Sequence, residues 1–191
     1  MWQDSLKLNS GNCEVAIRNE SVYSPGSADN KFAFDKQFVL NDEEGFSFSN
    51  HSVVVSCHEG RTYSCFLIAG GGGTRVHDNS ALVDGNNLLV AVGNYVCALP
   101  LSILEVEWQT QTDLVTCFGI YHSPRHRRYI SHGECDIVGL SYSGEILWQA
   151  SGEDIFTGAF ILHEDFISAV DFNNKSYRID IETGSCRLTA S

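Results

Sequence analysis

Short runs of alternating apolar and polar residues, separated by glycine and asparagine turns, fill the second half of the chain. Three such runs begin the pattern, at residues 88–92, 129–132 and 166–170. A polar turn and a second alternating run follow each of them, at residues 95–99, 136–140 and 176–180. Alternation with a period of two between such turns is typical of half-buried antiparallel strands. The pattern therefore predicts an all-β chain.

The same pattern recurs at intervals of about 40 residues. Trp108 and Trp148 are 40 residues apart, and Leu99 and Leu140 are 41 apart. A repeat of this length with four short strands has the period of a β-propeller blade. One four-stranded sheet has an apolar face that it cannot bury alone, so such units stack face to face. We interpret the two tryptophans as packing residues between blades, with stacking on a ligand as the alternative.

The repeated motif resembles the PQQ-like, quinoprotein-type β-propeller repeat, and WD40-like propellers are the nearest rival. The matching residues are Ala98-Leu99 with Trp108, Gly139-Leu140 with Trp148, and Ile179 with Thr183-Gly184. The resemblance covers roughly residues 78–188 and implies antiparallel four-stranded repeats in a partial or small propeller. The third repeat has Cys186 in the region where the others have tryptophan. No counterpart of the family's cofactor-binding residues is found, so we expect no cofactor.

We expect residues 1–191 to form a single all-β domain. The blade-like repeats are residues 76–112, 113–153 and 154–188, and the first strand of each is expected at 81–83, 115–120 and 155–160. Residues 13–75 are expected to supply diverged N-terminal strands, at 13–17, 31–40, 46–49, 53–57 and 63–69, with an acidic turn at 41–45 and a polar lead-in at 1–12. Three blades do not close a ring. The fold is then an open partial propeller, a ring completed by the N-terminal strands, or a homo-oligomer.

The charge balance narrows the choice of partner. The chain has 12 basic and 24 acidic residues and a formal net charge of −12. Binding to nucleic acid or to an anionic membrane needs basic surface, so neither is expected. A basic protein partner is compatible with this charge. No secretory signal is evident, and no apolar run approaches the length that spans a membrane.

Cysteine usage suggests a location. The sequence has seven cysteines, most of them within apolar strand patterns, and no CxxC pair. We interpret them as reduced core residues of a cytoplasmic, bacterial protein.

Three aspartates precede the expected first strands of the repeats: Asp78, Asp113 and Asp154. Equivalent positions in a propeller lie at the same end of its axis, so these carboxylates could ring one mouth and bind a cation or a basic group. Alternatively, each aspartate caps its own turn by accepting backbone N–H groups. His77 stands beside Asp78 and joins the candidate binding set.

A basic loop at residues 123–128 adds Arg125 and Arg127 to that set. The corresponding loops of the other two repeats lack this charge, which suggests a specific contact; a solvated loop is the alternative. His122, His126, His132 and Cys135 invite a metal hypothesis, but Pro124 and the strand-and-turn pattern break the necessary spacing, so no metal is expected.

Motifs of catalysis are missing from the sequence. Residues 70–74, GGGGT, lack the GK[ST] and the helix of a phosphate loop, so we expect them to let the chain approach another backbone. Neither a GxSxG nor an HExxH motif occurs. We therefore expect a non-enzymatic binding module, possibly an acidic immunity-type protein that neutralises a basic protein. A small-ligand binder or an enzyme that uses the carboxylates at one mouth is the alternative.

Overall fold

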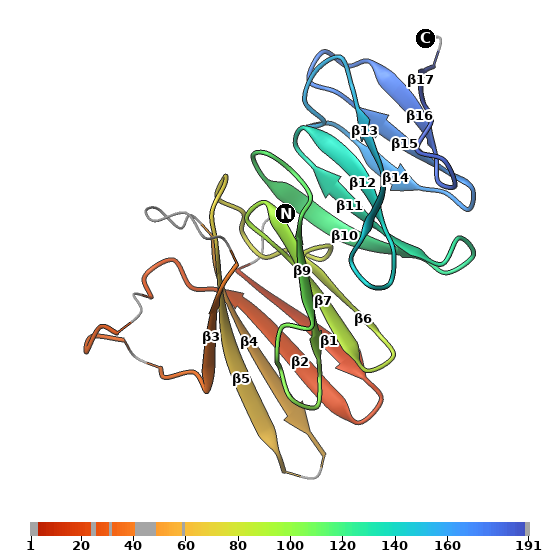
Figure 1. The fold of residues 1–191 in the computed structure, drawn as a ribbon. Coiled ribbons are helices and arrows are strands. Elements are labelled where there is room, and N and C mark those ends of the chain that lie inside the picture. Colours follow the sequence, from red (N-terminus) through yellow and green to blue (C-terminus); the bar gives the residue numbers. More distant parts are fainter. Residues whose placement is uncertain (1–3, 24–25, 31, 41–48, 59, 190–191) are drawn as a thin grey trace.

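The computed structural model describes residues 4–23, 26–30, 32–40, 49–58 and 60–189. These residues form four sheets of mainly antiparallel strands, which follow one another along the chain (Figure 1). The first sheet has the order β1-β2-β4-β5-β3. Its strands are β1 (Ser5–Ser10), β2 (Cys13–Asn19), β3 (Lys36–Val39), β4 (Ser49–Cys57) and β5 (Thr62–Ala69). In this sheet β3 runs parallel to β5, and the other pairs are antiparallel.

The next three sheets each contain four consecutive antiparallel strands. The second sheet consists of β6 (Ala81–Asp84), β7 (Asn87–Val92), β8 (Tyr95–Pro100) and β9 (Trp108–Gln111). The third consists of β10 (Cys117–Ser123), β11 (Arg128–Gly133), β12 (Asp136–Leu140) and β13 (Ile146–Ser151). The fourth consists of β14 (Phe160–Leu162), β15 (Phe166–Val170), β16 (Ser176–Asp180) and β17 (Cys186–Leu188). The prediction of an all-β fold with four-stranded, propeller-like repeats is confirmed.

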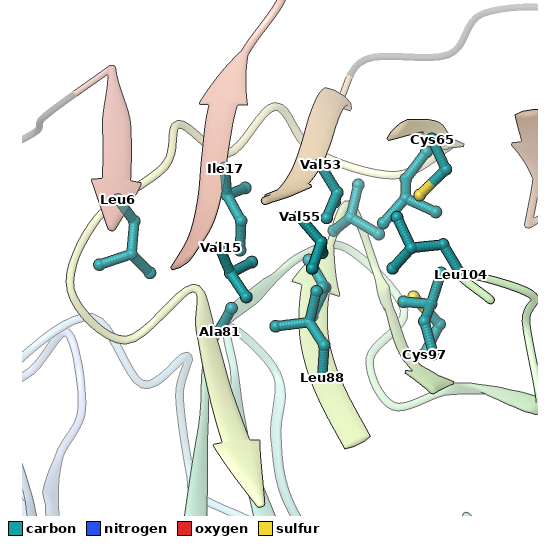
Figure 2. Close-up of a cluster of buried hydrophobic side chains, with 14 of the residues drawn as sticks. Leu6, Val15, Ile17, Val53, Val55, Cys65, Ala81, Leu88, Cys97 and Leu104 are labelled. Atoms are coloured by element: carbon teal, nitrogen blue, oxygen red, sulfur yellow. The ribbon is translucent and has the colours of Figure 1, made fainter. Parts of the chain in front are cut away.

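The sheets stack because each strand can bury side chains on both faces. In β7, Leu88 and Val90 join a cluster shared with the first sheet, whereas Leu89 and Ala91 join a cluster shared with the third. Figure 2 shows the first of these clusters, in which Val53 and Val55 of β4 lie opposite Leu88. This double burial explains why β7 is apolar at nearly every position rather than strictly alternating.

The stack is an open arc within the described residues. Buried clusters join the first sheet to the second, the second to the third and the third to the fourth, and none joins the fourth sheet to the first. Figure 1 shows the fourth sheet, in blue, well separated from the first, in red to gold.

Both tryptophans lie at equivalent joints of this stack. The Trp108 ring covers Gly144 of the next sheet, and the Trp148 ring covers Gly184 of the sheet after that. The Trp148 Nε1–H also donates a hydrogen bond of 2.8 Å to the Ile181 carbonyl. Gly144 has a φ of +83° and an added Cβ would lie 2.5 Å from the Trp108 ring, so only glycine fits there. The interpretation of the tryptophans as inter-blade packing residues is confirmed.

The glycine-rich segment after β5 makes a similar close approach. An added Cβ on Gly71, whose φ is +84°, would lie 2.2 Å from the Val115 carbonyl oxygen. The neighbouring Gly72 N–H donates to that oxygen at 2.6 Å. These glycines let one backbone contact another, as the sequence predicted.

Some local predictions were wrong. Residues 4–12 are more than a lead-in, because β1 pairs with β2 and Leu6 is buried against the core. The last repeat's first strand begins at Phe160 rather than at residue 155. The backbone there crosses between sheets, and the Phe156 N–H donates to the Glu134 carbonyl of the third sheet at 2.6 Å. In residues 32–40 only β3 is a strand. The acidic turn predicted at 41–45, and residues 46–48 of the strand predicted at 46–49, lie outside the described residues.

The cysteines also depart from expectation. Cys13 and Cys57 form a disulfide, and the other five cysteines are free. The antiparallel register of β2 and β4 places these two residues directly opposite each other. Disulfides persist in oxidising compartments and are rare in the cytosol, so this bond and the predicted cytoplasmic location point in opposite directions. The described chain contains no helix that could span a membrane.

Candidate ligand cavity between the third and fourth sheets

A hollow opens where the starts of the last three sheets come together. Its volume is about 590 Å³, within the range of roughly 300–1,000 Å³ that small-molecule sites occupy. Its lining residues come from the segment before β6, from β10 and β11, and from the segment leading into β14. They are His77, Asp78, Asn79, Phe118, Tyr121, His132, Phe156, Thr157, Gly158 and Phe160.

Aromatic rings form the inner wall of this cavity. Phe160 stacks on Tyr121 with ring centroids 4.6 Å apart and on His132 with centroids 4.4 Å apart. Phe118 meets the His132 ring edge-on at 5.4 Å. The rings thus form a contiguous wall that crosses from the third sheet to the fourth. Such a wall suits a flat apolar ligand, because aromatic pairs prefer offset-stacked or edge-to-face contacts.

An irregularity in β10 creates room for this wall. The register with β11 shifts between Cys117 and Gly119, and Phe118 lies at the shift. A β-bulge of this kind re-aims a side chain and is common beside functional sites. Gly119 also lets the preceding segment approach, since an added Cβ would lie 2.9 Å from the Asn79 carbonyl oxygen. The same oxygen accepts a hydrogen bond of 2.9 Å from the Ile120 N–H.

The rim of the cavity is polar. A tight turn holds His77 in place: its backbone N–H donates to Ser80 Oγ at 2.9 Å, and its Nδ1 accepts the Asn79 N–H at 3.2 Å. Burial lowers the pKa of His77, although hydrogen bonding to the Phe118 backbone and the Asp78 charge partly oppose this shift. Asp78 is exposed and presents its carboxylate to solvent at the cavity edge.

His132 is the most deeply buried polar group of the wall. Burial lowers its pKa from 6.5 to about 4, against the opposing effect of a hydrogen bond to the Phe156 backbone. The imidazole is therefore neutral at pH 7. It contributes a flat, uncharged face rather than a positive charge.

The three predicted aspartates have different surroundings. Asp78 lines the cavity, whereas neither Asp113 nor Asp154 is among the lining residues. Asp113 is buried and its two oxygens accept four backbone N–H groups, those of Val115, Thr116, Cys135 and Asp136, at 2.7–3.0 Å. Asp154 accepts the Ile155 N–H at 2.8 Å and an amide N–H of Asn173 at 2.6 Å. Two of the three therefore cap turns, which was the alternative reading of the sequence.

The predicted basic loop contacts the next sheet of the same chain. Arg125 lies 2.5 Å from Glu164 and 3.3 Å from Asp165, in the loop between β14 and β15. Arg128 is largely buried and binds Glu182 at 2.9 Å. Arg127 is exposed in a turn with a φ of +52°. Two of the loop's three arginines, Arg125 and Arg128, are thus paired with acidic residues that follow strands of the fourth sheet.

The histidines considered as metal ligands have separate partners. His122 Nε2 lies 2.9 Å from the Tyr142 hydroxyl, His126 lies beside Asp165, and His132 faces the cavity. Among the residues that the structure describes, no group of three or more His, Cys, Asp or Glu side chains could hold a metal ion.

Sequence reasoning missed the aromatic wall. Phe118 and Phe160 are 42 residues apart, one repeat, and both lie where a repeat begins. That spacing was the available signal. It was overlooked because phenylalanine in a strand pattern is most often a core residue.

No family model and no curated protein matches the chain. Among solved structures, it is similar to the dihydro-heme d1 dehydrogenase NirN in complex with DHE, with a TM-score of 0.55 and 12% sequence identity. The match covers 75% of this chain and 34% of that one, so the chain spans about a third of its neighbour's length. At this identity the likeness establishes the fold. The chain is an all-β protein of propeller-like architecture.

Proposed function

We propose that this chain is a binding module for a small planar aromatic molecule that is neutral or positively charged. The observation that carries the proposal is the aromatic-walled cavity formed by Phe118, Tyr121, His132 and Phe160. A flat ring can stack against this wall, while a polar or cationic substituent reaches the Asp78 carboxylate at the rim. Stacking of this kind contributes about 0.5–1.5 kcal/mol beyond area burial.

The charge of the site favours such ligands over anions. The cavity lining contains an exposed carboxylate and no arginine or lysine, and the chain as a whole carries a net charge of −12. An anionic substituent would find no cationic partner in the lining and would be repelled by the overall field. The solved neighbour's title names a complex with DHE, which makes a ligand-binding propeller plausible without transferring that ligand.

Binding fits the cavity better than acid–base catalysis does. A general base works best when its pKa lies near the operating pH. With a pKa of about 4, His132 is neutral but weakly basic at pH 7. The imidazole rings of His77 and His132 also form hydrogen bonds with backbone groups.

Several sequence-based hypotheses stay predictions. Neutralisation of a basic protein has the net charge as its support, and the cytoplasmic location, the bacterial source and a homo-oligomer are likewise expectations. We also infer that the three blades belong to the PQQ-like type rather than the WD40-like one. The support is the repeated joint in which Trp108 covers Gly144 and Trp148 covers Gly184.

The proposal is tested by fluorescence titration with two planar probes of opposite charge, cationic acridine orange and anionic anilinonaphthalene sulfonate. We expect the cationic probe to bind more tightly. Phe160→Ala should weaken its binding by about threefold to tenfold through lost stacking. Asp78→Asn should reduce the preference for the cation while leaving the stacking contribution in place.

Two further variants make the result specific to the cavity. Thr157→Trp adds bulk at an exposed lining residue and should block binding. Asp29→Asn, which removes an exposed carboxylate from a remote loop, is the matched control and should change nothing. Equal effects of Asp78→Asn and Asp29→Asn, or binding that survives Thr157→Trp, would place the probe elsewhere and overturn the proposal.

A further inference from the structure

Two arginines face each other across the fourth sheet. Arg178 on β16 is the register partner of Arg187 on β17, and both are exposed. Like charges directly opposite each other on neighbouring strands destabilise a sheet. A hollow of about 240 Å³ lies over the pair and is lined by Arg178, Asp180, Thr183, Ser185 and Arg187. It shares no lining residue with the aromatic cavity.

Among the described residues, neither arginine of this pair has an ion-pair partner, although the chain has twice as many acidic as basic residues. Most basic side chains of the described residues are matched by a carboxylate; the pairs are Lys7–Glu14, Lys36–Glu105, Arg75–Asp4, Arg125–Glu164, Arg128–Glu182 and Lys175–Glu153. In the same part of the chain, neither Arg178 nor Arg187 has a carboxylate at ion-pair distance. The two positive charges are therefore uncompensated.

One of the two guanidinium groups is held in position. The central carbon of the Arg178 guanidinium lies 3.2 Å from the Phe166 ring centroid. The His163 ring stacks on the same Phe166 ring, with centroids 4.2 Å apart. Cation–π contact of this kind orients a guanidinium without consuming its N–H donors. A preorganised donor loses less conformational entropy when a ligand binds.

The one acidic residue in the hollow is already committed to the protein. Asp180 Oδ1 accepts the Thr183 N–H and the Thr183 hydroxyl, each at 2.8 Å. Hydrogen bonding to Thr183 lowers the pKa of Asp180, so the residue is ionised. The hollow therefore has two cationic side chains against one carboxylate, a net positive charge, with the Ser185 side chain at its edge.

We propose that the Arg178–Arg187 hollow binds a tetrahedral oxyanion, the phosphate or sulfate group of a small molecule. Two guanidinium groups supply several N–H donors in a fork geometry that matches the oxygens of such an anion. A bound dianion would also remove the repulsion between the two arginines. The proposal is independent of the aromatic cavity and does not rest on the function proposed for it.

Isothermal titration calorimetry with inorganic phosphate, at constant ionic strength, tests the proposal on the full chain. Because hydrogen bonds from a charged donor are about twice as strong as neutral ones, Arg178→Gln and Arg187→Gln should each weaken phosphate binding at least about tenfold. Arg18→Gln removes one exposed positive charge from the first sheet and is the matched control. The affinity of the Arg18→Gln variant for phosphate should stay within about twofold of that of the wild type.

Titrations with other anions, and one further variant, identify the chemistry of the ligand. Sulfate should bind comparably to phosphate, and acetate should bind at least about tenfold more weakly because it is planar and carries a single charge. Phe166→Leu should weaken phosphate binding while circular dichroism confirms that the variant folds. The proposal is overturned if the wild type does not bind phosphate, if Arg18→Gln weakens binding as much as Arg178→Gln, or if acetate binds as well as phosphate.

Discussion

The joint between the first and second sheets differs from the joint between the third and fourth. Among the described residues, the cluster at the first joint buries aliphatic side chains and has its aromatic rings, those of Phe38, Tyr63 and Tyr95, at its margin (Figure 2). The second buries Trp148, Phe156 and Tyr177 and has Tyr121 and Phe160 at its margin. Aliphatic side chains interdigitate and close the space between sheets, whereas rigid rings meet at angles and leave a hollow at the edge. The same stacking arrangement thus yields a solid core in one place and a candidate site in the other.

The largest expected effect comes from the disulfide, which crosslinks β2 and β4 within the first sheet. Cys13 and Cys57 are 44 residues apart, so the chain-entropy model gives the crosslink about 3–4 kcal/mol. Urea unfolding with and without reductant measures this contribution, and a Cys13→Ser/Cys57→Ser double variant should match the reduced protein. Thiol titration of the denatured, unreduced protein should find five reactive cysteines; seven would show that the bond does not form.

The two glycines that face tryptophan rings, Gly144 and Gly184, should be equally intolerant of substitution. Gly144→Ala and Gly184→Ala each place a methyl group against a tryptophan ring in a backbone with positive φ, and should cost about 2–3 kcal/mol of unfolding free energy. Gly85 also has a positive φ, +61°, but open space around it. Gly85→Ala should therefore cost only about 1 kcal/mol. Similar losses in all three variants would contradict the role given to the tryptophans.

A buried histidine in each region makes stability depend on pH. Burial lowers the pKa of His51 in the first sheet and of His132 in the cavity wall from 6.5 to about 4. The unfolded chain takes up these protons first, so stability is complete above about pH 6.5 and falls as the pH drops toward 4. Each histidine should account for about 1–2 kcal/mol of the loss between pH 7 and pH 5.

Substitutions separate these two contributions. Neither ring nitrogen of His51 has a hydrogen-bond partner of good geometry in the described structure, although the nearby Asn50 backbone favours the charged ring. His51→Leu should therefore remove its share of the pH dependence at little cost at pH 7. His132→Leu should do the same and also alter probe binding, whereas His51→Leu should not. Urea unfolding at several pH values would contradict this if the slope survived in both variants.

The smallest effect is expected at Asp154, whose repeat-equivalent residue Asp113 should matter more. Asp113→Asn leaves some of four backbone N–H groups without an acceptor and should cost about 1–3 kcal/mol, whereas Asp154→Asn should cost less than about 1 kcal/mol. Thermal unfolding of the two variants provides the comparison. Equal losses would mean that the carboxylate of Asp113 does not hold its turn together in solution.

Much of the fold was predictable because it depends on local patterns. Alternating strands, the 40-residue interval and the tryptophan positions all reflect the same requirement, that each sheet must bury both faces against its neighbours. Strand β1 escaped detection because its apolar content is only Leu6 and Leu8, too short a pattern to stand out.

The sequence by itself determined the all-β class, the repeat length and the tryptophans that pack between sheets. Tertiary structure alone decided which residues meet across repeats. It paired Cys13 with Cys57, turned Asp113 inward as a cap, matched Arg125 with Glu164, and brought Phe118, Tyr121 and Phe160 around one hollow. Periodicity reports which face of a strand is buried, but partners from different sheets are chosen by the stacking angle and register, which no single segment encodes.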